Sequence, residues 1–557
     1  MNGFTQYRRR RPISTTMNRA IIFSLLLILL SALPGWGATY YVKFGGNDSL
    51  DGLSDVTAWA TITKVQATVK SGDTVCFRSQ DTWTSSANLV LTTKTGVTYD
   101  GSSYGSGTRA KLTTTFDDSG AAGARMVAMP ASNVTFKGFE IDGNGKRTGG
   151  IYIGDYVDAD VSNVTIDNCV IHNTNGVAGV DWLYGILVTP MYANRTVSYV
   201  TIINSEIYDN WHDGVTVYAK WGVANAKNKY ITIANCNIHN NGKDTVYPGP
   251  GIEVTNDSEN VTMQYNSIHD NNGAGIFLRV SPANEGGTNV VAAPNNIIVR
   301  YNIIFNNRDY AFWTADGRAF PMTADIYDNI IYNNSFETAQ AQCADFIFYG
   351  DTSINHSVFN IYNNTFYNSR AACSQGRATI RFDENYSVAS TAIYNLKNNI
   401  LSSANGTLII DRRAGSVHSN NLLYRSSGTS DSHVCSPYLF TDWICVAYNR
   451  AQVNTLGGGK GPWEGSAQNT DPNFTGGTLP TGFSGTYGVN MVPNTNYFAI
   501  TTGNALNNGT TLGTPFNWSI NGAGLATPLT RPQGAAYDIG AYEYMSPLPT
   551  PLALKFQ

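Results

Sequence analysis

Residues that could transfer protons are concentrated between positions 181 and 318 of the chain. Asp213 and Glu253 could act as an acid and a base, and Lys220 and Arg279 could accept a proton or hold a carboxylate. Aromatic side chains lie in the same stretch, and their flat faces can pack against the CH groups of sugar rings. Acids, cations and aromatic rings in one stretch indicate a carbohydrate site.

Aromatic, imidazole and guanidinium side chains are the expected substrate-binding residues. The planar guanidinium and imidazole groups can donate hydrogen bonds to the hydroxyl and carboxylate groups of a glycan. Corner segments of the same stretch also carry Trp182 and Asp309, without an assigned role. The expected binding residues are Trp211, His212, Tyr218, Trp313, Arg318 and Arg381.

A recurring phrase of about ten residues predicts the elements that position these side chains. It appears, for example, as VTIDNCVIHN (164–173), VTIINSEIYDN (200–210) and ITIANCNIHNN (231–241). Its last apolar residue recurs at steps of 27 to 36 residues from Ile141 to Leu401. Apolar residues alternate within the phrase, as they do in a β-strand. Strand repeats of this period predict a solenoid, in which each layer buries the apolar face of the next.

A second, shorter strand precedes most phrases, as in DGVTVY (213–218) and PGIEVT (250–255). Alternation directs Val215 and Ile252 inward, so their neighbours must face outward. Adjacent layers are about 4.8 Å apart, so Glu253 and Arg279 can meet. One outward column contains Leu187, Thr216, Glu253, Phe277, Trp313, Ile347 and Arg381, and the column beside it contains Thr189, Tyr218, Thr255, Arg279, Tyr349 and Asp383.

The repeat resembles the right-handed parallel β-helix of the pectate-lyase-like superfamily over roughly residues 125–425. The opening TYYVKFGGNDSLDGLS (39–54) and the closing RPQGAAYDIGAYEY (531–544) resemble the ends of secreted bacterial β-helix proteins. The resemblance implies an all-β fold: a right-handed parallel β-helix solenoid of roughly ten coils, with an N-terminal helical cap and an irregular C-terminal cap. It also implies a polysaccharide ligand on the outer face of one sheet.

Two catalytic arrangements fit the acids and cations. In a lyase, Lys220 or Arg279 would remove the proton next to a uronate carboxylate, and Ca²⁺ held by Asp213 and Glu253 could neutralise that carboxylate. In a hydrolase, Asp213 and Glu253 would be the carboxylate pair. The alternative is a non-catalytic glycan-binding or structural cell-surface protein, because this fold serves both classes.

Composition excludes some partners. The chain has 36 Lys and Arg residues against 40 Asp and Glu residues, so it lacks the basic excess of a nucleic-acid binder. No stretch of the mature chain is long and apolar enough for a transmembrane helix. We expect a monomer whose partner is a polysaccharide.

The N-terminus has the pattern of an export signal. Arg8 to Arg11 supply positive charge, Ile21 to Leu30 form an apolar run, and Gly35 and Gly37 have the spacing of a cleavage site, with Met17 as an alternative start. We therefore expect an extracytoplasmic protein. The predicted divisions are a signal peptide (1–37), an N-terminal cap with the first coils (38–124), the repeats (125–425), C-terminal loops and cap (426–544) and a tail (545–557).

Seven cysteines leave at least one thiol unpaired in a monomer. Cys435 could bridge to Cys445, and Cys343 to Cys373. Cys169 and Cys236 lie two layers apart, too far for a disulfide, and are expected to be buried. A column of His172, His239 and His269 recurs at one corner position of the repeat, where we expect hydrogen bonding rather than metal binding.

Overall fold

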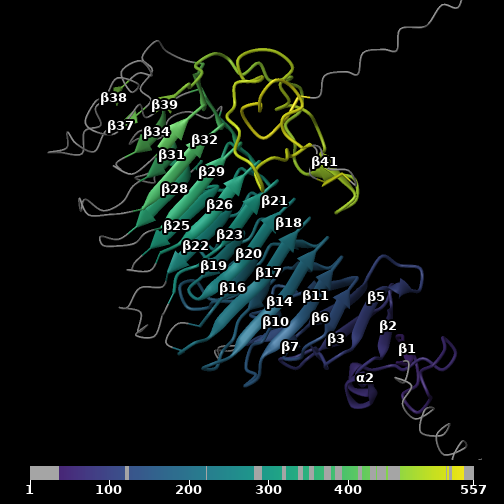
Figure 1. Cartoon of the computed structure of the whole chain (residues 1–557). Helices are drawn as coiled ribbons and strands as arrows, with labels where there is room; N and C mark the ends of the chain where they lie inside the picture. Colours follow the sequence, from purple (N-terminus) through teal and green to yellow (C-terminus); the bar gives the residue numbers. More distant parts are fainter. Residues whose placement is uncertain are drawn as a thin grey trace, which may run out of the picture.

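The computed structural model describes residues 37–118, 124–220, 223–280, 292–316, 321–336, 343–350, 357–368, 378–382, 392–404, 406–411, 417–426, 434–435, 447–448, 464–521, 524–525 and 530–544. Within them, three long parallel sheets wind around one apolar core as a parallel β-helix (Figure 1). The expected signal peptide, apart from Gly37, and the expected tail lie outside these residues.

Sheet A is formed by the first strand of each repeat phrase, and its order follows the chain from one coil to the next. Its strands are β1 (Thr39–Val42), β2 (Thr74–Arg78), β5 (Thr98–Tyr104), β8 (Val134–Lys137), β11 (Val161–Asp167), β14 (Thr196–Ile203), β17 (Lys227–Ala234), β20 (Ser258–Gln264), β23 (Ile297–Arg300), β26 (Thr323–Tyr327), β29 (Val358–Tyr362), β32 (Ile393–Lys397), β35 (Val417–Ser419) and β39 (Glu464–Gly465).

Sheet B is formed by the second half of the phrase, in most coils after a two-residue corner. Its strands are β3 (Thr82–Ser85), β6 (Ala110–Thr114), β9 (Phe139–Asp142), β12 (Val170–His172), β15 (Glu206–Tyr208), β18 (Asn237–His239), β21 (Ser267–His269), β24 (Ile303–Phe305), β27 (Ile330–Tyr332), β30 (Thr365–Asn368), β33 (Ile400–Ser403) and β36 (Leu422–Arg425).

Sheet C is formed by the short strands that precede each phrase, and it ends in an antiparallel pair, β37 and β38. Its strands are β4 (Leu91–Thr92), β7 (Arg125–Met129), β10 (Gly149–Ile153), β13 (Ile186–Val188), β16 (Val215–Tyr218), β19 (Ile252–Thr255), β22 (Ile276–Val280), β25 (Phe312–Asp316), β28 (Ala344–Gly350), β31 (Ala378–Phe382), β34 (Thr407–Asp411), β37 (Val434–Cys435) and β38 (Ala447–Tyr448).

The number of coils is close to the prediction. Sheet B has 12 strands, so the described chain makes about twelve coils where roughly ten were predicted. The coils without the repeat phrase lie at both ends, where β3 and β6 precede the phrases and β36 follows them with the same pairing. Parallel strand pairing and an apolar inner face are sufficient to extend the helix without the phrase.

The predicted outward columns on sheet C are confirmed by the strand register. Leu187 pairs with Thr216, Thr216 with Glu253, and Glu253 with Phe277. The series continues through Trp313 and Ile347 to Arg381. Thr255 pairs with Arg279 in the neighbouring column, whose last predicted member, Asp383, lies outside the described residues. Alternation therefore predicted which side chains share this face.

Asparagine forms many of the corners between sheets A and B. Asn168, Asn204 and Asn235 have left-handed backbones with φ between 50° and 54°, a conformation that Asn tolerates well. Their amides also bond along the column, because Asn235 Nδ2 donates to Asn204 Oδ1 at 2.8 Å. The next position points inward and holds small or amide side chains, including Cys169 and Cys236. Both cysteines are free and buried, as expected.

A short helix lies at the N-terminal end of the solenoid (Figure 1), where a cap was predicted. This helix, α2 (Ile62–Thr68), is the one helix in the described chain, and the Thr61 side chain caps it by accepting from Lys64 N at 3.1 Å. Val65, Val69 and the neighbouring Trp59 belong to the main apolar core. The Asp48 carboxylate accepts hydrogen bonds from the backbone N–H groups of Ala60 and Thr61, just before the helix.

The C-terminal segment 464–544 was predicted to form loops and a cap. Its described residues pack against the outside of the solenoid. Its small sheet comprises β40 (Phe483–Ser484), β41 (Asn490–Pro493) and β42 (Gly524–Leu525). The segment covers aromatic residues such as Tyr265, Tyr301 and Tyr332 that face outward at the corner and on sheet B. Those rings need apolar cover, and the segment supplies it.

Candidate functional site

A pocket of about 380 Å³ opens on the outer face of sheet C, over β19, β22 and β25. Its walls combine aromatic, proline and charged side chains from three strands and from the loops that precede them. It is lined by Trp182, His212, Val246, Tyr247, Pro248, Pro250, Glu253, Ala274, Phe277, Arg279, Asp309, Trp313 and Ala315.

The pocket floor is formed by the predicted outward columns. Arg279 Nη1 lies 4.0 Å from Glu253 Oε1, and the side chains are 24% and 8% exposed respectively. The rings of Phe277 and Trp313 stack with centroids 4.0 Å apart. The cavity therefore combines a guanidinium, which can bind a carboxylate, with a flat apolar surface, which can pack against a sugar ring.

One wall of the pocket carries an oriented histidine. His212 Nδ1 donates to Asp213 Oδ1, and Thr216 Oγ1 donates to the other Asp213 oxygen at 2.5 Å. The His212 and Asp213 side chains are 6% and 0% exposed. His212 Nε2 is buried and has no hydrogen-bond partner in the described part of the chain. Because Nδ1 carries the proton, Nε2 is left as the basic nitrogen.

Two loops raise the rim of the pocket. Trp182 stacks on Tyr247 at 5.8 Å and lies 4.6 Å from the His212 ring, yet it is 48% exposed. The loops are tied together because Gly179 N donates to both oxygens of Asp244, at 3.2 and 3.0 Å. The rim is therefore anchored by its backbone and presents exposed aromatic side chains.

Two further titratable groups flank strands of sheet C: Tyr184 precedes β13, and Asp155 follows β10. Burial raises the pKa of Tyr184 well above its ordinary value, and the nearby Asp213 and Glu253 carboxylates add to the effect. Burial also raises the pKa of Asp155 to about 6, although the positive charges of Arg125 and Lys220 oppose the rise. The Tyr184 phenol therefore stays protonated.

The structure brings some of the predicted site residues together and separates others. Glu253, Arg279, His212 and Trp313 line the pocket, and Asp213 supports it from behind. Lys220 acts on Asp155 beside β10, toward the N-terminal layers, and is not one of the residues that line the cavity.

The remaining predicted binding residues that the structure describes do not line the pocket. Tyr218 ends β16, and buried Trp211 donates its backbone N–H to Thr174 Oγ1 at 2.9 Å; neither lines the pocket. Arg381 lies four layers from Glu253 along the column, about 19 Å away at the spacing of parallel strands. Arg318 falls outside the described residues.

Trp182, Tyr247 and Asp309 complete the pocket without having been assigned a role from sequence. Trp182 and Asp309 could be placed in corner loops, but alternation does not define where loop residues point. Tyr247 carried no sequence signal except its place in a Pro- and Gly-containing loop, YPGPG (247–251).

The donor set does not fit calcium in its present arrangement. Both oxygens of Asp213 accept hydrogen bonds from His212 and Thr216, and the Arg279 guanidinium already lies beside Glu253. Calcium needs six to eight oxygen ligands, so Asp213 would have to exchange both of its bonds. The reaction proposed below therefore uses no calcium ion.

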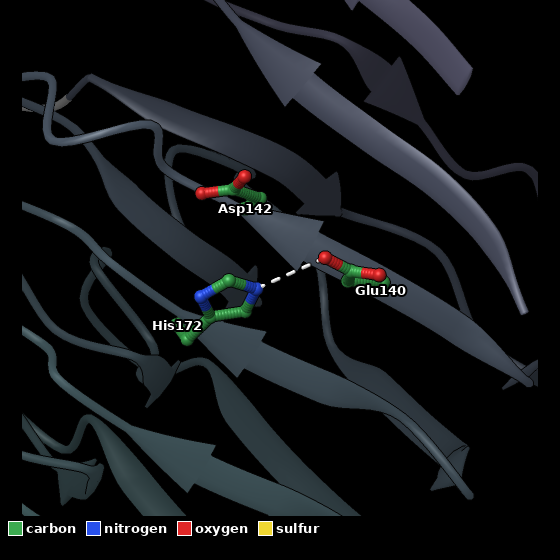
Figure 2. A group of neighbouring side chains, drawn as sticks. All are labelled: Glu140, Asp142 and His172. Carbon is green, nitrogen blue, oxygen red and sulfur yellow. Dashed lines mark hydrogen bonds and ion pairs between the residues drawn. The ribbon is translucent and has the colours of Figure 1, made fainter.

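A separate cluster on sheet B has the residue types of a metal site. Figure 2 shows Glu140, Asp142 and His172, whose ligand atoms lie within 4.8 Å of one another. However, Lys111 Nζ lies 2.9 Å from Glu140 and 2.7 Å from Asp142, so an ammonium already balances both carboxylates. His172 Nε2 bonds Glu140 at 3.2 Å. The cluster is an ion-pair network.

His172 also begins a column of stacked rings on sheet B. Its ring lies 4.8 Å from Tyr208, Tyr208 lies 5.1 Å from His239, and His239 lies 4.9 Å from His269. His239 Nε2 pairs with Glu206 and His269 Nε2 with Asn237, at 3.2 and 3.0 Å. The expected hydrogen-bonding role is confirmed, but the histidines lie within strands instead of at corners.

Cys343 is disulfide-bonded, as expected. Cys373 and Cys445, two of the expected partners, lie outside the described residues.

In the part of the chain that the structure describes, no helix has the length and apolar character needed to cross a membrane.

Comparisons with known proteins agree with this fold. A family model described as "Right handed beta helix region" matches residues 183–291, which include β13, β16, β19 and β22 around the pocket. Together with the three parallel sheets, this match supports the right-handed β-helix predicted from the repeat. Comparison with curated proteins gives no match.

Solved β-helix structures resemble the chain distantly. Pectate lyase Pel9A is 16% identical with a TM-score of 0.45, over 91% of this chain and 97% of that one. The mannuronan C-5 epimerase AlgE4 A-module of Azotobacter vinelandii is 16% identical with a TM-score of 0.42, over 63% and 94%. The GH136 lacto-N-biosidase of Eubacterium ramulus is 13% identical with a TM-score of 0.41, over 81% and 69%. Similarities at this level carry no argument about activity.

Proposed function

We propose that the chain is an exported polysaccharide lyase that cleaves a uronate-containing glycan in the pocket on sheet C. The observation that carries the proposal is His212, whose Nδ1 is held by Asp213 while its buried Nε2 is left without a partner among the described residues. A histidine oriented by a carboxylate is a typical general base. Arg279 and the Phe277–Trp313 surface lie in the same cavity.

The reaction would be a β-elimination. His212 Nε2 takes the proton from the sugar carbon next to the carboxylate, C5, and Arg279 stabilises the negative charge that develops on that carboxylate. The electron pair of the C5–H bond forms a C4–C5 double bond as the C4–O bond breaks. The departing oxygen takes a proton from water, and the hydroxide left behind takes up the proton that His212 accepted, which restores the neutral imidazole.

The proposal places the substrate between the rim and the floor. Trp182 packs against the imidazole and must swing aside for a sugar to reach Nε2, and its high exposure allows this movement. The stacked Phe277 and Trp313 rings would then support the neighbouring sugar. Lys220, the earlier candidate for the base, keeps an electrostatic role through Asp155.

The test uses purified 38–557 with a panel of uronate-containing and neutral polysaccharides, with and without Ca²⁺. An unsaturated product absorbs in the ultraviolet, whereas both elimination and hydrolysis create reducing ends. The proposal expects both signals to rise together on uronates, with calcium making no difference. Reducing ends alone would identify a hydrolase, which the presence of both Glu253 and Asp309 in the cavity would support.

Two variants test whether His212 or Lys220 is the catalytic base. His212→Gln keeps an amide of similar reach but no basic nitrogen, and should lower kcat by about 10²-fold or more. Lys220→Met is the matched control, because Lys220 lies outside the cavity lining, and should retain most activity. Loss of activity in Lys220→Met with full activity in His212→Gln would overturn the assignment. If the folded protein cleaves nothing on a broad panel, the binding or structural alternative replaces it.

A further inference from the structure

A column of left-handed residues runs along the edge of the outer face of sheet A. Strand register aligns Asn133, Asn163, Tyr199, Tyr230, Asn260 and Asn296, all with φ between 53° and 58°. Asparagine suits this backbone, and Asn163 Nδ2 donates to Asn133 Oδ1 at 3.0 Å. Two tyrosines interrupt this asparagine ladder in adjacent layers, β14 and β17.

Tyr265 and Tyr301 have the same left-handed backbone, but apolar residues of the C-terminal segment pack against them. Tyr199 and Tyr230 belong to no such apolar cluster among the described residues. A bulky side chain is disfavoured at positive φ, and observed strain of this kind justifies looking for a function. Tyr199 and Tyr230 are 55% and 47% exposed, so they bury little area in return. Their rings stack on one another with centroids 4.8 Å apart and an interplanar angle of 14°.

The stack leaves ring surface available to a ligand. Asn163 and Asn260, the neighbours on either side, have much shorter side chains than tyrosine. The outer part of each ring therefore projects beyond the ladder, with one face toward each end of the solenoid. Such faces attract the CH groups of a sugar ring.

The surface beside the rings is rich in hydroxyl groups. Eight threonines are paired in successive layers of sheet A, and each hydroxyl can donate and accept a hydrogen bond. Nearby charges are already paired, as in Lys229 with Glu259 and Arg195 with Asp158. The eight are Thr39, Thr74, Thr98, Thr135, Thr165, Thr201, Thr232 and Thr262.

We infer that Tyr199 and Tyr230 form a second glycan-binding site, in which a sugar ring of a polysaccharide packs against an outer tyrosine face beside the threonine column of sheet A. The inference rests on the proposed function only in taking a glycan as the ligand. The pocket lies on sheet C, and the apolar core separates it from this site. The platform would hold a long polymer while one of its sugars occupies the pocket.

The test is affinity electrophoresis of the whole chain in gels that contain each polysaccharide. The double variant Tyr199→Asn/Tyr230→Asn restores the residue used elsewhere in the ladder, so it should be at least as stable as the parent. We expect about tenfold weaker retention, and unchanged turnover of oligosaccharides too short to span both sites. Tyr192→Asn, at another tyrosine that is 40% exposed, is the matched control and should not alter retention.

Unchanged retention of the double variant on every polysaccharide that retards the parent would overturn the inference. A lower unfolding midpoint with unchanged retention would show that the pair serves only the fold, and no retention of the parent itself would also refute it. The proposed lyase is tested separately by product formation, so a failed cleavage assay with tyrosine-dependent retention would leave this site standing.

Discussion

His212 and Asp213 are consecutive residues whose side chains bond to each other at the bottom of the pocket, with Nδ1 of the imidazole donating to the carboxylate. Thr216 holds the second carboxylate oxygen at 2.5 Å, so the pair cannot rotate freely. The bond fixes the neutral tautomer in which Nε2 carries no proton. Asp213 is therefore a positioning residue in the proposed reaction.

Asp213→Asn should impair proton transfer while preserving shape. The amide can donate to Nδ1, which would move the imidazole proton to Nε2 and remove the base. We expect kcat to fall by about 10²-fold or more and KM to change little. Steady-state kinetics over a range of pH checks this, and Thr216→Val is the milder control. A rise in KM of similar size with an unchanged kcat would instead indicate a binding role for Asp213.

Alternation in the short strands was sufficient to predict the floor of the site. It placed Glu253, Phe277 and Trp313 in one column and Arg279 in the next, because the period of a strand and the layer spacing leave little freedom. The fold was predictable for the same reason, since the phrase repeats with its corner asparagines.

The rim of the pocket could not be predicted from the same pattern. Trp182 and Tyr247 lie in loops whose course depends on tertiary contacts such as that between Gly179 and Asp244. Arg381 illustrates the opposite error, because it shares the column of Glu253 but lies four layers away. A column predicts the face of a side chain, and only the course of the loops decides which layers form a site.

Asn302 belongs to a second asparagine ladder, the buried inward-pointing asparagines that follow the corners between sheets A and B. Its replacement should destabilise the fold strongly. Its Nδ2 donates to Met263 O at 2.9 Å and to Asn329 Oδ1 at 3.0 Å, while its Oδ1 accepts from Asn266. Asn302→Ala would leave several buried polar groups unsatisfied, at about 1–3 kcal/mol each. We expect the free energy of unfolding to fall by about 3 kcal/mol or more in urea titrations. Asn395→Ala, at a half-buried amide on sheet A, should cost less than about 1 kcal/mol; equal losses would contradict the ladder's role.

Arg531 should hold the C-terminal segment against the solenoid. Its Nη2 lies 2.9 Å from Asp328 Oδ1 and its Nη1 lies 3.4 Å from Glu543 Oε2, with the arginine and Asp328 side chains fully buried. Arg531→Met would leave buried carboxylates without their cation, and we expect a loss of about 3–5 kcal/mol. Limited proteolysis should then cleave the segment 464–544 earlier than in the parent. The double variant Arg531→Met/Asp328→Asn should recover part of the loss, whereas no recovery would mean that Asp328 is not the group left uncompensated.

Asp155 should give the protein a stability term that weakens as the pH rises. Burial raises the pKa of this carboxyl from 3.8 to about 6, despite Arg125 and Lys220, and its side chain is 3% exposed. Between these two values the folded state binds a proton that the unfolded state has released, so this term is fully present below about pH 4 and is lost as the pH rises through about 6. The loss would amount to roughly 3 kcal/mol at 1.36 kcal/mol for each pKa unit. Asp155→Asn is neutral throughout and should flatten this part of the curve of unfolding free energy against pH. Asp158→Asn, at an exposed ion pair with Arg195, should leave the slope intact, and an unchanged slope in Asp155→Asn would show that this carboxyl is already ionised in the folded state at low pH.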